Sequence, residues 1–573
     1  MATLFDISPF EKPEIPLNPE QRGAVEHGEG PLLVVAGAGT GKTRVITERI
    51  RHLLKTDAGL AGENILGLTF TDKAAAEMKR RVVAAAGERA KGVTLTTFHA
   101  FCHTLLAAAD PSMQLLDKVD HWILLRRNMP RLRLEYYRRL AEPGQFLGDF
   151  VEFFSRCQDE LVTPEDYERF ADELARRFEQ EKHSLEENVR REREEEAVRQ
   201  REIARAYRAS EALLSEKKQL TFGALLADTV RMLRNHPALC REFQERFRHI
   251  LVDEFQDTNV AQLELLWLFA GKQRNIVAVG DDDQAIYRFR GASFGSFKIF
   301  LERFAGHTRD RSSLARYSVS LTVNYRSTAK ILRIAGQVIA QNSRDPMFPP
   351  KLLRSRKEEG RKIRIAEFET PDQEAHWVAS EIERIHASGR RWSHFAVLYR
   401  MHSHRDALVR ELARRKIPFV IKNLSILENR LVRDVRAYLR LIAHPSDNVA
   451  CARMLAAPAW GFEPRDLMRL CGRASKSKRT PLYDALQAPQ SELPFTAARN
   501  TSELTAFLAG LRATMKRRAV TELLAELRGW LELHRVATPV DEKYLERLWE
   551  FVRPWEAKSE TKTLPEFLEY LDF

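Results

Sequence analysis

Short apolar runs alternate with amphipathic stretches over the first hundred residues and again from about residue 249. Residues 32–35 read Leu-Leu-Val-Val, and a glycine-rich turn follows them. After this turn, apolar residues recur at the three- and four-residue spacing of a helix. Repeated alternation of a strand with a helix predicts a parallel sheet that helices cover on both faces. We expect its further strands at residues 65–70, 93–97, 250–252 and 276–279.

The pattern changes at about residue 103, where strand-like runs stop and helical spacing dominates. Residues 179–208 carry dense mixed charge, which is typical of a solvated helix face with ion pairs four residues apart. We therefore interpret residues 103–220 as an all-helical insertion in a first α/β domain. That domain consists of residues 1–102 and 221–313.

A second α/β segment follows, and from about residue 427 the pattern is again mostly helical. We assign residues 314–426 to the N-terminal part of a second α/β domain and residues 427–573 to a second helical insertion. The length of 573 residues also exceeds what one hydrophobic core supports. The strands of this second segment are expected at residues 320–323, 363–368, 395–399 and 419–421.

Charge and cysteine content narrow the class of protein. Lys plus Arg number 92 against 80 Asp plus Glu, which gives a formal charge of +12. This excess favours a polyanionic partner such as a nucleic acid, although it is equally compatible with a basic protein that has none. The five cysteines contain no C-x-x-C pair, which argues against a zinc site and indicates a reducing, cytoplasmic compartment. No run of 18 apolar residues predicts a membrane span.

A phosphate-binding loop follows the first predicted strand. It lies between a strand and a helix, which is the context that a P-loop requires. Backbone N–H groups of such a loop converge on phosphate oxygens, and the helix N-terminus adds a favourable dipole. We expect Lys42 to reach the β- and γ-phosphates of a nucleoside triphosphate and the Thr43 hydroxyl to ligate Mg²⁺. The loop residues are Ala36, Gly37, Ala38, Gly39, Thr40, Gly41, Lys42 and Thr43.

Two adjacent acids close the predicted strand at residues 250–252. Hydrolysis needs one carboxylate to hold the metal ion and another to activate water. We expect Asp253 to hold Mg²⁺ and Glu254 to act as the general base. Adjacent acids carry weight here because they end an apolar strand downstream of a P-loop.

The longer strings around these acids resemble the UvrD/Rep family of superfamily 1 DNA helicases. Residues 253–259 read DEFQDTN, and residues 279–292 read VGDDDQAIYRFRGA. The resemblance implies a P-loop NTPase with two RecA-like parallel-sheet domains, the second incomplete, each carrying a helical insertion. Other matching elements run in family order: LNPEQ at 17–21, FTDKAAAEM at 70–78, TFHAF at 97–101, VNYRS at 323–327 and FAVLYR at 395–400.

The resemblance also implies roles at the nucleotide. Gln21 would hydrogen-bond adenine, while Arg44 and Tyr325 would pack on the two faces of its ring. Gln284 would sense the γ-phosphate, and Arg326 would act as an arginine finger from the second domain. A fixed guanidinium stabilises charge on the transferring phosphoryl group. Together with the P-loop lysine and the general base, the implied catalytic residues are Lys42, Glu254, Gln284 and Arg326.

A set of aromatic and polar residues is implied to bind single-stranded DNA and its junctions with duplex. Aromatic rings stack on any base, at about 1–3 kcal/mol each, and so bind without reading sequence. The family commonly has Trp at the position of Phe289, and a phenyl ring still stacks. The implied contacts are Phe70, Thr71, Phe98, His99, Tyr287, Phe289 and Arg290.

Three departures from the family limit this transfer of roles. Asp72 replaces a usual Asn in the first strand-binding motif, and residues 220–226 lack the acids usual there. A motif resembling Thr-x-His-x-Ala-Lys-Gly-Leu-Glu and a later one with Thr-Arg-Ala are both missing, so the chain resembles a truncated helicase. We expect an ATP-dependent 3′→5′ DNA helicase of repair or recombination. The alternatives are the N-terminal part of a helicase–nuclease, or a nucleotide- and DNA-binding remnant without productive turnover.

Overall fold

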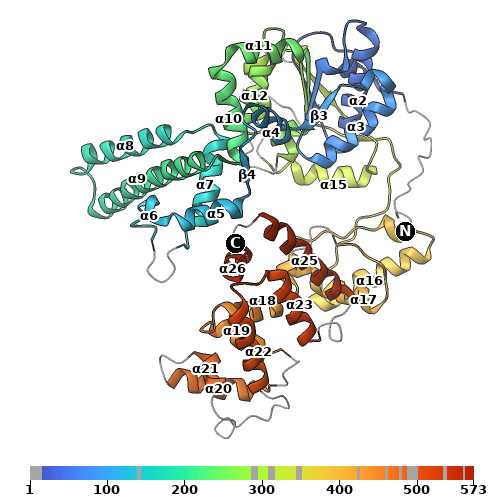
Figure 1. Ribbon diagram of the computed structural model, residues 1–573. Coiled ribbons are helices and arrows are strands. Elements are labelled where there is room, and N and C mark those ends of the chain that lie inside the picture. Colours follow the sequence, from blue (N-terminus) through green and yellow to red (C-terminus); the bar gives the residue numbers. More distant parts are fainter. Residues whose placement is uncertain are drawn as a thin grey trace. The chain divides into compact units, whose positions relative to one another are not determined.

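The computed structural model divides the chain into two compact units, Met1–Arg364 and Ile365–Phe573 (Figure 1). We describe each unit separately. No helix among the described residues is both long and apolar enough to cross a membrane. The structure describes residues 16–138, 144–285, 295–306, 316–342, 351–421, 426–457, 462–476, 481–486, 501–532, 539–558 and 562–572.

A six-stranded parallel sheet forms the centre of the first unit, in the order β3-β2-β6-β7-β1-β8. Strands β1, β2 and β7 are buried along their whole length, as expected for a sheet with both faces covered. The five strands predicted up to residue 280 are confirmed, with ends within one residue of those expected. Their bounds are β1 (Leu32–Ala36), β2 (Ile65–Thr69), β3 (Thr94–Thr97), β6 (His249–Val252) and β7 (Ile276–Gly280).

Helices cover both faces of this sheet, which confirms the α/β class. Alternate residues of β1 enter different cores, with Leu32 and Val34 in one and Leu33 and Val35 in the other. The first core includes apolar residues of α2, and the second includes those of α4, α10, α12 and α13. The helices are α1 (Pro19–Val25), α2 (Lys42–Thr56), α3 (Asp72–Ala86), α4 (Phe98–Ala109), α10 (Phe222–Asn235), α11 (Pro237–Arg246), α12 (Val260–Ala270) and α13 (Ser296–Phe304).

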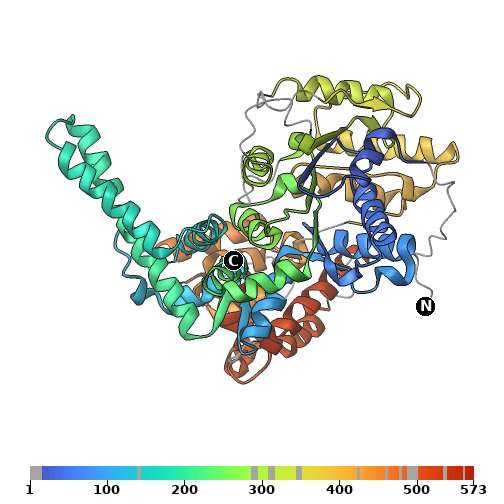
Figure 2. The ribbon, with the colours of Figure 1, turned by 90° about the horizontal axis from the view of Figure 1, so that it is seen from above.

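The helical insertion begins and ends at two short strands that pair with each other, β4 (Gln114–Leu116) and β5 (Gln219–Thr221). The sequence pattern did not reveal β4, because three residues are too few to show alternation. Helices α8 and α9 form a hairpin that extends away from the sheet (Figures 1 and 2). Ion pairs such as Arg193–Glu181 cross between its helices, whereas the mixed charge predicts pairs four residues apart on one helix. The helices are α5 (Lys118–Arg127), α6 (Met129–Leu132), α7 (Leu147–Asp159), α8 (Pro164–Glu181) and α9 (Glu187–Glu216).

The strand predicted at residues 320–323 begins two residues earlier in the structure and pairs in a different sheet from the one expected. Strand β8 (Ser318–Leu321) starts earlier and pairs with β1, so it is an edge strand of the first sheet. After it, β9 (Val323–Asn324) and β10 (Arg354–Ser355) form a parallel ribbon, and α15 (Ala329–Ile339) lies between them in sequence. The domain boundary at residues 313 and 314 stays a prediction.

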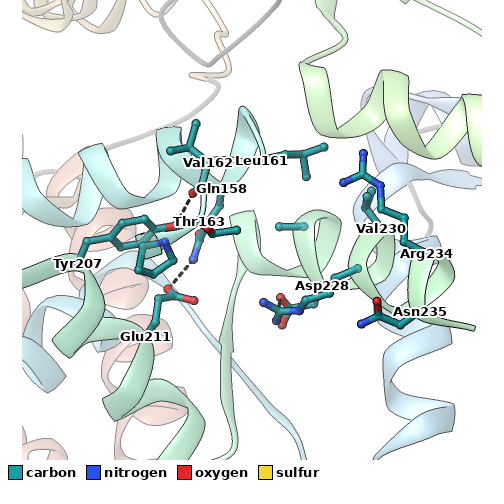
Figure 3. Close-up of a pocket in the computed structure, with 13 residues that line it drawn as sticks. Gln158, Leu161, Val162, Thr163, Tyr207, Glu211, Asp228, Val230, Arg234 and Asn235 are labelled. Carbon is teal, nitrogen blue, oxygen red and sulfur yellow. Dashed lines mark hydrogen bonds and ion pairs between the residues drawn. The ribbon is translucent and has the colours of Figure 1, made fainter. Parts of the chain in front are cut away.

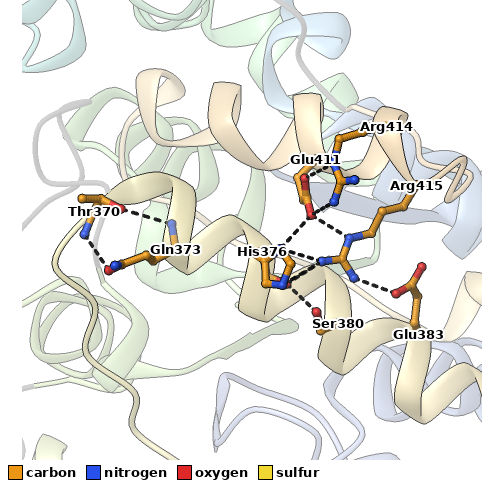
Figure 4. Close-up of polar contacts among 8 residues, drawn as sticks. All are labelled: Thr370, Gln373, His376, Ser380, Glu383, Glu411, Arg414 and Arg415. Atoms are coloured by element: carbon orange, nitrogen blue, oxygen red, sulfur yellow. Dashed lines mark hydrogen bonds and ion pairs between the residues drawn. The ribbon is translucent and has the colours of Figure 1, made fainter.

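A polar cluster clamps the first two helices of the second unit together (Figure 4). Glu411 accepts hydrogen bonds from Arg414 and Arg415, which lower the pKa of its carboxyl to about 2. Arg415 also contacts His376 and pairs with Glu383 at 2.7 Å. The clamp therefore joins α16 (Pro371–Ala387) to α17 (Arg405–Arg414).

Three predicted strands of the second α/β segment form no hydrogen-bonded ladder, although the structure describes all their residues. Residues 363–368, 395–399 and 419–421 are irregular rather than strands. Apolar side chains that a sheet would cover are exposed there: Ile365 is 97%, Leu398 94% and Val420 89% exposed. The apolar pattern predicts a strand, but a strand exists only where another strand supplies its hydrogen-bond partners.

The rest of the second unit is helical in its described residues, as the pattern predicts. One core joins these helices, from Val432 to Leu571, and includes Tyr483, Trp555 and Phe567. The helices are α18 (Arg430–Ala443), α19 (Asn448–Leu455), α20 (Pro464–Lys476), α21 (Leu482–Leu486), α22 (Thr501–Thr514), α23 (Val520–Trp530), α25 (Pro539–Lys558) and α26 (Leu564–Asp572).

Candidate nucleotide-binding site

The predicted P-loop connects the end of β1 to the start of α2. Gly39 and Gly41 have φ values of 76° and 95°, in the left-handed region that favours glycine. A Cβ atom at Gly39 would lie 2.5 Å from the Cβ of Arg326, and one at Gly41 would lie 2.8 Å from Gln21 Nε2. Both backbone conformation and close packing therefore require glycine at these two positions.

The two acids predicted to act on ATP lie opposite the P-loop. Lys42 Nζ lies 3.0 Å from Glu254 Oε2, and the Thr43 hydroxyl donates to Asp253 Oδ2 at 3.4 Å. Asp253 is fixed by its backbone N–H, which donates to Leu68 O on β2 at 2.9 Å. The structure thus brings the two pairs of residues together at the carboxyl edge of the sheet, where α/β proteins bind ligands.

The environment of Asp253 suits a metal ion. Burial and the neighbouring Glu254 charge raise the pKa of Asp253 to about 6. A divalent cation favours the ionised form and would reverse this shift. The hydroxyl of Thr43 with the carboxylate of Asp253 is an oxygen donor set that fits Mg²⁺. When bound there, Mg²⁺ would neutralise charge on the phosphate oxygens of ATP.

A buried amide links the predicted general base to the predicted phosphate sensor. Gln256 Nε2 donates to Glu254 Oε2 at 2.9 Å, and Gln256 Oε1 accepts from the Asp281 N–H at 2.9 Å. Asp281 in turn accepts from the Gln284 amide. We did not single out Gln256 from the sequence, because only its place inside the DEFQDTN string marks it. It connects β6 to β7 at the site.

Gln21 lies fully buried between the first helix and the P-loop. Its Nε2 donates to Thr40 O at 2.9 Å, and its Oε1 accepts from the Asn18 N–H at 3.2 Å. Asn18 Nδ2 also donates to the Tyr325 hydroxyl at 3.1 Å. These contacts gather Gln21 and Tyr325 beside the first turn of α2, which carries Arg44. Their contacts with adenine stay a prediction.

Two residues that follow β8 donate hydrogen bonds to backbone carbonyls of the P-loop. The Tyr325 N–H donates to Gly39 O at 2.9 Å, and the Asn324 side chain donates to Ala38 O. Asn324 Oδ1 accepts from the Arg326 N–H at 2.9 Å. The predicted arginine finger is therefore placed at Gly39 within the first unit, and its side chain is exposed.

A buried arginine that sequence reasoning missed fixes the end of the first helix. Arg49 on α2 donates to the carbonyls of Val25, His27 and Gly28 at 3.0, 2.7 and 3.2 Å. Burial lowers the pKa of its guanidinium to about 10. Arg49 thereby attaches the helix that carries Gln21 to the P-loop helix. A lone arginine in an amphipathic stretch gave no sequence signal for this role.

The predicted DNA contacts have mixed surroundings. Phe98 is only 5% exposed and packs in the core, whereas Thr71 is exposed and caps α3. Phe70 and His99 are half-buried, and burial lowers the pKa of His99. Tyr287, Phe289 and Arg290 lie outside the described residues. DNA binding by all seven stays a prediction.

Two neighbouring residues bear on these predicted contacts. Asp72, the departure in the first strand-binding motif, accepts a hydrogen bond from the Thr97 hydroxyl at 3.2 Å. It therefore joins α3 to the end of β3. Phe222 is half exposed, with its ring 6.1 Å from that of His99, and we had not singled it out from the sequence.

A separate pocket of about 270 Å³ lies where the helical insertion meets α10 (Figure 3). Glu211 on α9 accepts from Gln158 Nε2 at 3.0 Å, and Asp228 pairs with Arg231. Burial raises the pKa of Glu211 to about 7 and also raises that of Asp228. None of the predicted nucleotide-binding residues lines this pocket, so it is not part of the ATP site. We call this junction between the helical insertion and α10, which carries the carboxyls of Glu211 and Asp228, the insertion seam.

The sheet, the P-loop and the paired acids define a P-loop NTPase with a parallel α/β fold. The profile of the UvrD/REP helicase N-terminal domain matches residues 17–305, and that of the UvrD-like helicase C-terminal domain matches residues 319–525. The chain belongs to the UvrD/Rep helicase family.

Curated relatives bear the name ATP-dependent DNA helicase PcrA. The Staphylococcus epidermidis protein is 31% identical over 477 residues, which cover 82% of this chain and 59% of that protein. The Staphylococcus aureus protein is 29% identical over 561 residues, which cover 96% of this chain and 69% of that protein. The chain thus spans about three fifths to two thirds of the length of these relatives.

Proposed function

We propose that the chain binds Mg-ATP at the P-loop and hydrolyses it to drive movement along single-stranded DNA. The observation that carries this proposal is the pairing of Lys42 with Glu254 beside the pairing of Thr43 with Asp253. One pair supplies a phosphate-binding cation and a base, and the other supplies ligands for a metal ion. The name of the relatives, ATP-dependent DNA helicase, agrees with this reading of the site.

The residues act in a defined order in the proposed reaction. The Lys42 ammonium leaves Glu254 for the β- and γ-phosphates, which frees the Glu254 carboxylate. Glu254 then takes a proton from the attacking water as its oxygen bonds to the γ-phosphorus, and the bond to the β-phosphate oxygen breaks. Gln284 and Arg326 stabilise the charge on the transferring group. Without nucleotide, the Lys42–Glu254 pair keeps the base occupied.

DNA is the proposed polymer, bound as a single strand or at a junction with duplex. The positive net charge of the chain supports a polyanionic partner. We propose 3′→5′ movement, duplex unwinding and a role in repair or recombination in the cytoplasm of a bacterial-type cell. These finer features rest on family membership, and no residue of the site sets the polarity.

Single-stranded DNA-stimulated ATPase activity tests the proposal. Phosphate release is measured with Mg-ATP alone and with oligo-dT, in the wild-type chain and in Lys42→Ala as a matched blank. We expect oligo-dT to raise turnover at least tenfold in the wild type and to leave Lys42→Ala at background. Turnover by the wild type at the level of Lys42→Ala, under both conditions, would contradict hydrolysis by this chain.

A second candidate function is binding of nucleotide and DNA without productive turnover. Residues 395–399 and 419–421 form no strand, and this favours the second function, because an incomplete second sheet would not couple nucleotide binding to movement. Background turnover together with micromolar Mg-ATP affinity and DNA binding would select this second function. Unwinding of a 3′-tailed duplex would select the first.

A further inference from the structure

Three consecutive acids follow β7 at the edge of the nucleotide site, and a buried lysine faces all of them. Lys351 Nζ lies 2.6 Å from Asp281 Oδ1 and 3.1 Å from Asp283 Oδ2, and it also contacts Asp282. The side chains of Lys351 and Asp281 are each only 4% exposed. A buried ammonium among carboxylates is costly to expose or to remove, because each partner is left with an uncompensated charge.

The lysine begins a segment that lies on the P-loop. Two residues later, the Leu353 side chain packs on Gly37, where a Cβ atom would come within 2.7 Å of a Leu353 methyl carbon. Residues 354 and 355 then form β10, which pairs with β9, and the Arg356 N–H donates to Asn324 O at 2.9 Å. Because Asn324 and Tyr325 bind P-loop carbonyls, this ribbon and the P-loop form one packed body.

Asp281 is the shared member of two networks. Its carboxylate accepts from the Gln284 amide and pairs with Lys351, while its N–H donates to Gln256, which donates to Glu254. If the Gln284 amide turns toward a γ-phosphate, Asp281 loses that donor and retains Lys351 as its compensating partner. The position of Gln284 is therefore tied to the ribbon that leads to Arg326.

We propose that Lys351 is a positioning residue that couples γ-phosphate sensing by Gln284 to the ribbon carrying Arg326. This inference rests on the proposed function, because it assigns a role within the same ATP site. Burial lowers the pKa of Lys351, but the carboxylates of Asp281 and Asp282 outweigh it and raise the pKa, so the ammonium keeps its charge throughout the physiological range. Removal of that charge leaves the buried Asp281 carboxylate dependent on the Gln284 amide as its side-chain donor, so Gln284 turns less readily toward a γ-phosphate. The expected loss of binding affinity is specific to nucleotides that carry a γ-phosphate.

The test compares ATPγS with ADP in Lys351→Met, Lys351→Arg and a matched control. Lys330→Met is the control, because the Lys330 ammonium donates to the Gly360 carbonyl and has no acidic partner among the described residues. Equilibrium dissociation constants are measured with Mg²⁺, alongside thermal melting and ATPase kcat and KM. We expect Lys351→Met to weaken ATPγS about tenfold relative to ADP, within the usual range of coupling between sites. Lys351→Arg should restore most of the preference.

Two results would overturn the inference. One is a wild-type ratio of ATPγS to ADP affinity in Lys351→Met. The other is an equal loss of both nucleotides with a lowered melting temperature, which would indicate a structural role alone. If no variant, nor the wild type, hydrolyses ATP while the affinity ratio still falls in Lys351→Met, the coupling stands and the proposed hydrolysis fails.

Discussion

The ammonium of Lys42 lies 3.0 Å from the carboxylate of Glu254, so the proposed phosphate-binding cation and the proposed general base form an ion pair. Glu254 adjoins Asp253, and burial together with the Glu254 charge raises the pKa of the Asp253 carboxyl. In the proposed reaction, ATP replaces Glu254 as the partner of Lys42, so the base is expected to become available only when its substrate is bound.

Replacing either member of this pair should separate binding from hydrolysis. We expect Lys42→Ala to lower kcat at least 100-fold and to weaken ATP binding, because the phosphate loses its cation. Glu254→Gln should lower kcat by a similar factor with ATP affinity within threefold of wild type, since the amide keeps the shape of the side chain. ATPase assays and fluorescent-nucleotide titration measure both quantities. Wild-type turnover in Lys42→Ala would refute the assigned site.

The aromatic pair Tyr287 and Phe289 is expected to grip DNA by stacking. Tyr287→Ala combined with Phe289→Ala should weaken oligo-dT binding 10- to 100-fold, on the basis of about 1–3 kcal/mol for each stacked base. ATP affinity should stay within twofold of wild type. Fluorescence anisotropy measures the DNA affinity. Phe170→Ala is a matched control, because that ring is exposed on α8 within the helical insertion. Unchanged DNA affinity of the double variant would mean that these rings serve packing.

Glu211 makes the stability of the insertion seam depend on pH. Its carboxyl has a pKa of about 7 in the folded protein against an ordinary value of 4.5. The folded state thus binds this proton more tightly, and the resulting stabilisation is complete below pH 4.5 and lost as the pH rises through 7. Between pH 8 and 6 the free energy of unfolding should therefore gain on the order of 1–2 kcal/mol from this group as the pH falls.

Chemical denaturation of Glu211→Gln at pH 8 and pH 6 isolates this contribution. The variant keeps a neutral hydrogen-bonding side chain, so the difference in stability between the two pH values should shrink relative to wild type. Glu192→Gln serves as the control, because Glu192 is exposed on the same helix. An unchanged pH dependence in Glu211→Gln would show that the seam does not titrate in this range.

Arg49 is expected to matter for stability and for nucleotide affinity together. Arg49→Met leaves four backbone carbonyls without this donor, at a cost on the order of 2–4 kcal/mol. The helix that carries Gln21 should loosen, so the KM for ATP should rise while kcat changes less than threefold. Arg51→Met is the control, because Arg51 is a partly exposed residue of the same helix that pairs with Glu48. Equal effects of the two variants would contradict a special role for Arg49.

The sequence was most informative where chemistry is local. The P-loop, Asp253 and Glu254 each adjoin an apolar run, so their place at strand ends followed from covalent adjacency. Lys351 and Arg49 could not be found this way, because their partners are distant in the chain and are brought near only by the fold. Gln256 belongs to the DEFQDTN motif, but its hydrogen bonds to Glu254 and to Asp281 depend on the fold and cannot be read from the sequence.

Strand prediction differed for a related reason. A short apolar run indicates that a segment will be buried, and this indication was correct for the first sheet. It says nothing about whether a partner strand is present. Residues 395–399 carry the pattern without the ladder, and β8 carries it in a sheet other than the one expected. Pairing is a property of two segments, and a single segment cannot encode it.

The position of β8 determines where the chain can be cut to give a stable N-terminal fragment. A fragment that stops at residue 313 would lack β8 and would leave β1, the strand that leads into the P-loop, with one unpaired edge. It would also lack Tyr325 and Arg326. A fragment that extends through Arg364 retains the complete edge and the ribbon against the P-loop. Purified on its own, the longer fragment is therefore the one expected to remain monodisperse and to bind nucleotide.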